Sequence, residues 1–330
     1  MSKAARANLL CISACLLALS GCTSMKVRLG WKVYLDKTPI ASIEASLPKG
    51  PGMAPGAKSP LVVAVTEPTG KTLLTEGKGG GKVMWKDLQV TASVVTVNQK
   101  GVLSLSRDPR VSDGKVGHIT VTVPSHPDMK AELDIPFRYD VAFVSNFSGA
   151  TGSSGMNGTD GSDGAPGSTG SMDPNSPSAG GDGGNGTDGS NGEDGGNGGD
   201  APPVQVQVAL QAGSHPLLQV RVAAAGHKRL YLVDPQGGTL SVKADGGAGG
   251  SGGRGGRGGH GGSGGIGSPS GSNGRDGSDG RSGIDGSPGR GGLITVTYDP
   301  QVKTFLGTIH LSHQNGPAPV FKEETVAALW

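Results

Sequence analysis

Glycine recurs at every third residue in four separate stretches, and this period restricts the fold of the chain more than any other feature. The stretches span residues 149–170, 180–199, 246–267 and 271–292, and we number them runs 1 to 4. Three residues per turn is the period of the extended polyproline II helix, so one glycine in each turn leaves one face of bare backbone. A bare face allows a second backbone to approach closely. The sequence therefore predicts extended helices that associate through their glycine faces.

The two glycine-rich tracts each break near the middle, where a hairpin would turn. The breaks are Ser171–Ala179 in the first tract and Ser268–Ser270 in the second. Strand-like sequence flanks the second tract, with Leu240–Lys243 before it and Leu293–Tyr298 after it. If these two strands share a sheet, the tract must leave the sheet and return to it. We therefore expect each tract to form a hairpin of two runs.

The period resembles that of two kinds of protein. In collagen, three parallel chains from three subunits share one axis. In polyglycine II bundles, such as glycine-rich insect antifreeze proteins and some phage tail-fibre adhesins, antiparallel segments of one chain lie side by side. Proline is sparse in the runs and in the second break, where it occupies only positions 166, 269 and 288, and this scarcity argues against collagen. The central breaks also favour the bundle.

Doubled glycines indicate how the four runs are ordered. Runs 1 and 4 carry mostly one glycine per turn, run 2 is partly Gly-Gly-X, and run 3 is almost wholly Gly-Gly-X. Two bare faces suit an inner helix with two neighbours, so we expect the order outer, inner, inner, outer. The first tract is acidic and the second carries five arginines, and opposite charges favour association of the two hairpins. Disordered linkers and a collagen-like trimer remain as alternatives.

Outside these tracts the chain alternates apolar and polar residues with the period of β-strands. Over residues 25–147 we expect strands at 25–35, 61–66, 88–97, 102–106, 119–123 and 131–144. Turn signals separate these strands, which favours an antiparallel β-sandwich. In this pattern the region resembles the immunoglobulin-like modules of bacterial surface proteins.

A second, smaller β module surrounds the second tract. Its expected strands are 204–210, 218–222, 230–233 and 240–242, with 293–298 completing it and 309–311 as a last strand. Asp299 and Pro300 predict the start of a short helix that runs to Leu306. The predicted fold is thus mostly β plus polyproline II, with a sandwich, a small β module and a four-run antiparallel polyglycine II-type bundle.

The N-terminus has the features of an export signal. Lys3 and Arg6 precede an apolar stretch at Leu9–Leu19. The following Leu19-Ser20-Gly21-Cys22 resembles the lipobox of bacterial lipoproteins, in which the cysteine becomes the lipidated first residue. The resemblance implies attachment to a membrane through Cys22. In such lipoproteins an aspartate after the cysteine favours retention in the inner membrane. Here Thr23 takes that place, which favours the outer membrane but does not indicate which side of that membrane the protein faces.

These patterns divide the chain into six expected parts. They are the signal peptide with the lipobox cysteine (1–22), the sandwich (23–148), hairpin 1 (149–202), the small β module (203–245), hairpin 2 (246–292) and the module's completion with the C-terminal tail (293–330).

The sequence contains no pattern typical of an enzyme. We find no serine-nucleophile motif, no paired acid set and no metal-ligand cluster, so we expect neither catalysis nor a metal or other cofactor. Removal of the signal peptide brings the formal charge from +2 to about zero, which does not favour nucleic acid as a partner. Candidate tip contacts are Met172, Asp173, Asn175, Ser268 and Ser270, and candidate contacts for an anionic ligand are Arg254 and Arg257.

The expected function is that of a lipid-anchored envelope protein, structural or adhesive, whose glycine-rich repeats form a rigid spacer. A first alternative is a ligand-binding surface protein that uses the bundle face or the tip loops to hold a glycan or another surface. A second alternative is a collagen-like trimeric stalk. The expected partners are the membrane and an envelope or extracellular polysaccharide or protein, with a monomer favoured over a trimer.

Overall fold

The computed structural model describes residues 23–330, with side chains from residue 26 onward, and it is mostly β. Leu19, Ser20, Gly21 and Cys22 lie outside the described range. The chain forms two compact units, of which unit 1 ends at Val141 and includes Trp330, and unit 2 spans Ala142–Leu329. None of the helices in the described range has the length and apolar character needed to cross a bilayer.

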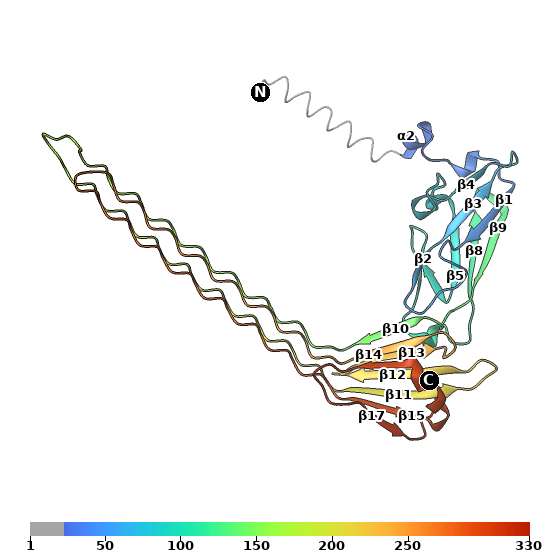
Figure 1. Cartoon of the computed structure of the whole chain (residues 1–330). Helices are drawn as coiled ribbons and strands as arrows, with labels where there is room; N and C mark the ends of the chain where they lie inside the picture. Colours follow the sequence, from blue (N-terminus) through green and yellow to red (C-terminus); the bar gives the residue numbers. More distant parts are fainter. Residues whose placement is uncertain (1–22) are drawn as a thin grey trace. The chain divides into compact units, whose positions relative to one another are not determined.

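Unit 1 consists of three antiparallel sheets around one core (Figure 1). The sheets have the orders β1-β3-β4, β2-β7-β6 and β5-β8-β9. Their strands are β1 (Ser42–Ser46), β2 (Lys58–Pro60), β3 (Val62–Thr66), β4 (Thr72–Leu74), β5 (Gln89–Ser93), β6 (Val95–Val97), β7 (Val102–Leu105), β8 (Gly117–Val123) and β9 (His126–Ile135). Val63, Leu103 and Ile119 are fully buried, so the alternating residues of all three sheets supply the core.

The strand expected at residues 25–35 is wrong. The chain forms helix α2 (Thr23–Arg28) there, followed by a turn and the short 3-10 helix η1 (Leu35–Lys37). Gly30 has a φ of 69°, and the bonds Gly30 N–H to Val27 O and Trp31 N–H to Lys26 O form a Schellman motif. This left-handed glycine ends the helix and interrupts the extended alternation that the sequence suggested.

Two other expected strands are each divided. Val94, with a φ of 66°, separates β5 from β6, and these strands belong to different sheets. The expected strand at 131–144 ends as β9 at Ile135, because Pro136 has no N–H to continue the ladder. The remainder forms β10 (Ala142–Asn146), which belongs to unit 2.

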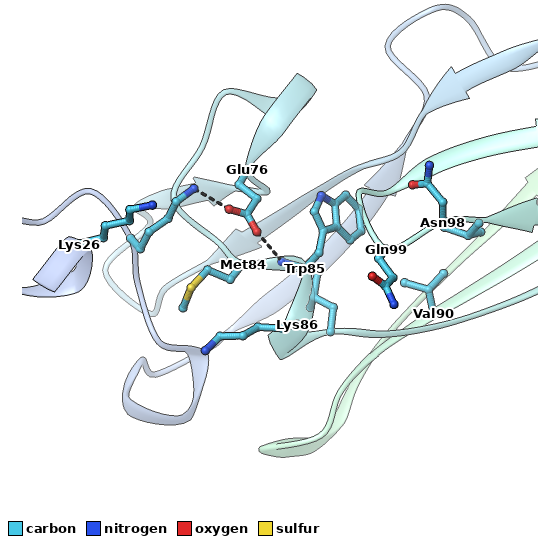
Figure 2. Close-up of a pocket in the computed structure, with 11 residues that line it drawn as sticks. Lys26, Glu76, Met84, Trp85, Lys86, Val90, Asn98 and Gln99 are labelled. Carbon is cyan, nitrogen blue, oxygen red and sulfur yellow. Dashed lines mark hydrogen bonds and ion pairs between the residues drawn. The ribbon is translucent and has the colours of Figure 1, made fainter. Parts of the chain in front are cut away.

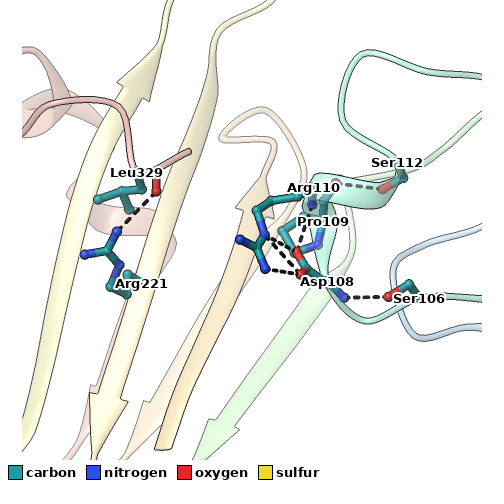
Figure 3. A network of polar contacts seen from close by, with 7 residues as sticks. All are labelled: Ser106, Asp108, Pro109, Arg110, Ser112, Arg221 and Leu329. Carbon is teal, nitrogen blue, oxygen red and sulfur yellow. Dashed lines mark hydrogen bonds and ion pairs between the residues drawn. The ribbon is translucent and has the colours of Figure 1, made fainter.

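Short 3-10 helices complete unit 1. They are η2 (Gly77–Gly79), η3 (Trp85–Asp87) and η4 (Pro109–Val111). Asp108 caps η4 by accepting from the Arg110 N–H, and its carboxylate also pairs with the Arg110 guanidinium (Figure 3).

Unit 2 contains two sheets with parallel as well as antiparallel pairing. One has the order β10-β14-β16 and is entirely parallel, and the other has the order β13-β12-β11-β15-β17. The strands are β11 (Val204–Gln211), β12 (Leu217–Ala224), β13 (His227–Val233), β14 (Thr239–Lys243), β15 (Ile294–Tyr298), β16 (Ile309–Ser312) and β17 (Val320–Glu323). Pairs β11–β15 and β15–β17 are parallel. β10 and β17 are members of this module that sequence patterns did not assign to it.

A single apolar core includes residues of both sheets of unit 2, among them the fully buried Val206, Val220 and Leu240. Asp299 caps the 3-10 helix η5 (Pro300–Thr308), which replaces the expected helix to Leu306. The C-terminal tail is bonded to β12, where Arg221 donates to the Leu329 carbonyl at 3.2 Å (Figure 3). The two sheets of the module therefore share one buried core.

Candidate functional site

The four runs leave one end of the unit 2 module together and extend far beyond it (Figure 1). We call the four runs the rod. Rows of backbone hydrogen bonds, 2.6–2.9 Å long, join the runs at every third residue. The structure describes every residue of the four runs, and all glycines with positive φ lie outside them. The glycines of the runs therefore have backbone conformations that other residues also adopt. Glycine is therefore required in the rod for space.

Five rows of bonds connect the rod. Run 1 donates N–H groups to run 3, from Gly149 to Asp245 through Gly170 to Ile266. Run 2 donates to run 1, from Gly181 to Ser168 through Gly199 to Ala150, and to run 4, from Gly180 to Pro269 through Gly198 to Ser287. Run 3 donates to run 2, from Gly247 to Gly199 through Gly265 to Gly181, and run 4 donates to run 3, from Gly271 to Gly265 through Gly289 to Gly247. Runs 2 and 3 thus each bond to three other runs, whereas runs 1 and 4 each bond to two. Rows between runs 1 and 3 and between runs 2 and 4 are parallel, and the other three are antiparallel.

The doubled glycines of run 3 correspond to two close approaches. A Cβ at Gly255 would lie 2.0 Å from the Gly280 oxygen of run 4, and a Cβ at Gly256 would lie 2.0 Å from the Thr159 oxygen of run 1. Both distances are far inside van der Waals contact, so neither position tolerates a side chain.

Run 2 is different, although it also has three neighbours. A Cβ at Gly183 would lie 2.0 Å from the Gly262 oxygen, but a Cβ at Gly184 would lie 3.1 Å from its nearest atom, the Ala165 nitrogen. Gly184 belongs to the row in which run 2 donates to run 1, and the next three residues of that row carry side chains: Thr187, Ser190 and Glu193. Run 2 needs only one bare face, and this explains its partial Gly-Gly-X pattern.

Aspartate and asparagine side chains add a second set of bonds along the rod. In run 2, Asx residues alternate at every third position, and each Oδ1 accepts a backbone N–H of run 4 at 2.6–2.8 Å. These acceptors are Asp182, Asn185, Asp188, Asn191, Asp194, Asn197 and, directly after the run, Asp200. Comparable bonds join Asp160 of run 1 to the Arg257 N–H and Asp279 of run 4 to the Gly258 N–H. The Asx side chains thereby satisfy N–H groups that the backbone rows leave over.

Charge pairing between the two hairpins takes a different form from the one expected. Within the described part of the chain, the rod's acid–base contacts within 4 Å reduce to His260 with Asp276 at 3.8 Å; both residues belong to hairpin 2, and the contact is an ion pair only when the imidazole is protonated. Asp160 of the acidic first tract accepts from the peptide N–H of Arg257. The carboxylates therefore hold the rod through backbone bonds, which charge counting could not reveal.

The sheets of unit 2 fix the register of the rod. β10 and β14 pair with Ala142 opposite Thr239 and Asn146 opposite Lys243, and run 1 then continues beside run 3 with Gly149 bonded to Asp245. Likewise β11 and β15 continue, towards the rod, as runs 2 and 4. Each parallel pair of strands thus extends without a slip into a parallel pair of runs, so the β module aligns the glycines.

Asp245 joins three segments at the base of the rod. Its carboxylate accepts from Ser312 Oγ at 2.6 Å and from the Gln314 N–H at 2.7 Å, with Ser148 Oγ at 3.5 Å. Burial raises the pKa of Asp245, but these hydrogen bonds and nearby Lys243 outweigh burial and leave the pKa below its ordinary value. The charged form therefore stabilises the junction between β10, β14 and β16.

We expect the stability contributed by Asp245 to be lost in acid. A depressed carboxyl pKa stabilises the fold above the unfolded-state value of about 3.9, and the contribution disappears as the pH falls from there through the lower folded-state pKa. Asp245→Asn keeps the acceptor oxygen and removes the charge, so its melting temperature should be lower than wild type at pH 7, and the difference should shrink as the pH falls below about 4. Asp173→Asn at the tip is the control, and a difference that stays constant as the pH falls would contradict this role.

The two breaks form the tip of the rod. The Ser268 N–H donates to the Ser178 oxygen at 2.9 Å, so the two loops lie against each other. Asp173 caps its own turn by accepting from the Asn175 N–H, and Ser270 Oγ donates to the Gly267 oxygen. The first bond joins the two loops, and the other two stabilise the turn within each loop.

The candidate tip residues come together, but the candidate anion contacts lie elsewhere. Met172 is 69 % exposed at the tip, and Ile266, which sequence analysis did not single out, is 62 % exposed in the last turn of run 3. The Gly170 N–H bonds to the Ile266 oxygen, which places Ile266 beside the start of the first tip loop. Arg254 and Arg257 are exposed on run 3, and Arg257 precedes Ile266 by nine residues, three repeats of the glycine period.

Sequence signals existed for some of what was missed. The strict alternation of aspartate and asparagine at every third residue of run 2 could have indicated the Asx bonds.

Across the described residues, no group of three or more His, Cys, Asp or Glu side chains is placed to hold a metal ion. A scan against models of known protein families finds no match, and no curated protein matches the chain.

Proposed function

We propose that the protein is a non-enzymatic lipoprotein of the bacterial outer membrane, anchored through Cys22, and that the rod is a polyglycine II-type bundle that acts as a rigid spacer. The observation that carries the proposal is the set of five hydrogen-bonded rows, which continue the register of two β-sheets out to a closed tip. At about 3.1 Å per residue, a run of 22 residues spans roughly 65–70 Å. Such a rod holds its tip at a fixed distance from its base.

A single-chain bundle accounts for the hydrogen bonds better than a collagen-like trimer. In a trimer the glycine N–H groups of one run would bond to other chains. Here Gly152 bonds to Ala248, and Gly250 bonds to Gly196, all within one chain. Runs 2 and 3 have three neighbours each, which leaves their glycine faces fully occupied.

Sedimentation equilibrium combined with circular dichroism tests this proposal. We expect the mature chain carrying Cys22→Ser to be a monomer that loses its polyproline II signal in a cooperative melt, because one chain satisfies the rod. A trimer, or a polyproline II signal without a cooperative melt, would contradict the single-chain bundle. Mass spectrometry of the wild-type protein extracted from membranes tests lipidation of Cys22 separately.

A second candidate function is recognition of a glycan or another surface by the tip. Its support is two exposed apolar side chains, Met172 in the first tip loop and Ile266 beside the start of that loop, together with the polar groups of Asp173 and Asn175 in the same loop. Screening the mature protein and its Met172→Ser variant on a glycan array distinguishes this function from that of a spacer alone, which would give no signal dependent on Met172.

A further inference from the structure

The N-terminal end of unit 1 gathers basic residues from two distant segments, residues 26–37 and 76–87. Val33 N–H donates to the Lys82 oxygen at 3.1 Å, and Lys32 Nζ pairs with Glu76 at 2.7 Å, so the segments lie side by side. We call these two segments the basic patch. Their charged residues are Lys26, Arg28, Lys32, Lys37, Lys78, Lys82 and Lys86, against Asp36, Glu76 and Asp87.

The positive charge of unit 1 is concentrated in this patch. The patch holds seven basic and three acidic residues, whereas residues 38–75 and 88–141 together hold nine and eight. Arg28, Lys37, Lys78, Lys82 and Lys86 are exposed. The excess therefore faces solvent, where it attracts an anionic surface.

A hollow of about 700 Å³ is lined partly by the patch and partly by residues 88–99 (Figure 2). Lys26, Lys32 and Lys86 line one part of it together with Glu76, the ion-pair partner of Lys32, while Leu88, Val90 and Val97 supply apolar lining elsewhere. Lys86 Nζ lies 5.2 Å from the centre of the Tyr34 ring, which is within the range of a cation–π interaction. The hollow thus combines an ammonium-rich part with an apolar part.

Exposed apolar side chains accompany the charge. Trp31 is 59 % exposed and Leu29 is 51 % exposed, both in the turn that follows α2. Tryptophan beside lysine and arginine is the combination that proteins use at the boundary between lipid and water. Lys26 is the fourth residue after Cys22, and four residues of chain span at most about 14 Å.

We propose that the basic patch binds the surface of an anionic phospholipid bilayer, with a headgroup phosphate held by Lys26, Lys32 and Lys86 and with Trp31 and Leu29 inserted at the interface. The proposal rests on the membrane attachment proposed for Cys22, but the binding itself requires no lipidation. Its consequence is that unit 1 lies on the membrane and is not merely tethered to it. A surface of lysines and one tryptophan binds a membrane only weakly by itself. Beside a covalent lipid anchor, the same surface is sufficient to orient unit 1 on the membrane.

Vesicle co-sedimentation of the mature chain with Cys22→Ser tests the proposal. We expect binding to phosphatidylcholine vesicles that contain 30 % phosphatidylglycerol, little binding to pure phosphatidylcholine, and weakening with salt. Lys26→Gln with Lys86→Gln should weaken partitioning about fivefold for each charge. Lys58→Gln with Lys100→Gln, exposed on unit 1 outside the patch, is the matched control and should bind as wild type does.

Trp31 provides a readout of insertion. The blue shift of tryptophan emission on anionic vesicles should disappear in Trp31→Ser, while the circular dichroism of the free protein stays the same. Equal binding to neutral and anionic vesicles, or equal loss in the patch and control variants, would overturn the proposal. All proteins in the vesicle assay carry Cys22→Ser, so their binding does not depend on lipidation. Failure of vesicle binding would therefore leave the proposed anchor at Cys22 standing, and failure to find lipid on Cys22 would leave the vesicle result standing.

Discussion

We expect Gly183→Ala to disrupt the rod and Gly184→Ala, one residue later in the same run, to leave it close to wild type. The Cβ at position 183 would lie 2.0 Å from the Gly262 oxygen, whereas the Cβ at position 184 would have its nearest atom at 3.1 Å. The first substitution forces run 2 away from run 3 and breaks local hydrogen bonds, at a cost of about 2–4 kcal/mol. The second places a methyl group where Thr187 and Ser190 already carry larger side chains.

The two variants control for each other. Both replace glycine with alanine in the same run, so each reduces the freedom of the unfolded chain by a similar amount. The difference between their melting temperatures, followed by the polyproline II signal, therefore isolates the steric effect. Hydrogen exchange should show faster exchange for Gly183 and its neighbours in the first variant only. Equal melting temperatures would show that run 2 is not packed against run 3 as described.

A single alanine inserted between Ser148 and Gly149 should have a still larger effect. The insertion moves run 1 by one residue, so that Thr151, Ser154 and every third residue after them replace glycines at the contact with run 2. A Cβ at the present glycine positions, such as Gly152 and Gly161, would lie 2.0 Å from a run 2 oxygen. We expect run 1 to detach along its whole length, with loss of its eight bonds to run 3.

The same alanine inserted between Asn175 and Ser176 is the control. It adds the same residue to the same hairpin but lies in the tip loop, where the phase of the glycines is unaffected. Hydrogen-exchange protection of the run 1 amides should be lost in the base insertion and retained in the tip insertion. Protection in both variants would mean that run 1 can change its register freely.

The mostly β character of the chain is confirmed, and much of it was accessible from alternation alone. β3, β8 and β11 lie close to the expected positions because each has a continuous alternating face directed at a core. The misplaced strands failed for local reasons. Gly30 and Val94 adopt positive φ, and Pro136 ends the hydrogen-bonded ladder of β9. Each of these residues interrupts a segment in which apolar and polar residues otherwise alternate without a break.

Candidate contacts were harder to infer than secondary structure. The tip residues are identifiable because a hairpin must turn at a break in the glycine period. Ile266 escaped notice because it occupies an X position of run 3 like any other. The basic patch could not be inferred, because Lys32 and Glu76 are 44 residues apart and meet only through the folded sheets.

The rows of bonds that tie each parallel pair of runs to a pair of strands have a consequence for how such a protein can vary. Adding one Gly-X-X triplet to each of the four runs restores every row and leaves the β module unchanged. Each addition would move the tip outward by about 9 Å. The reach of the molecule is therefore adjustable in discrete steps, by duplication of short stretches of coding sequence, without a new fold.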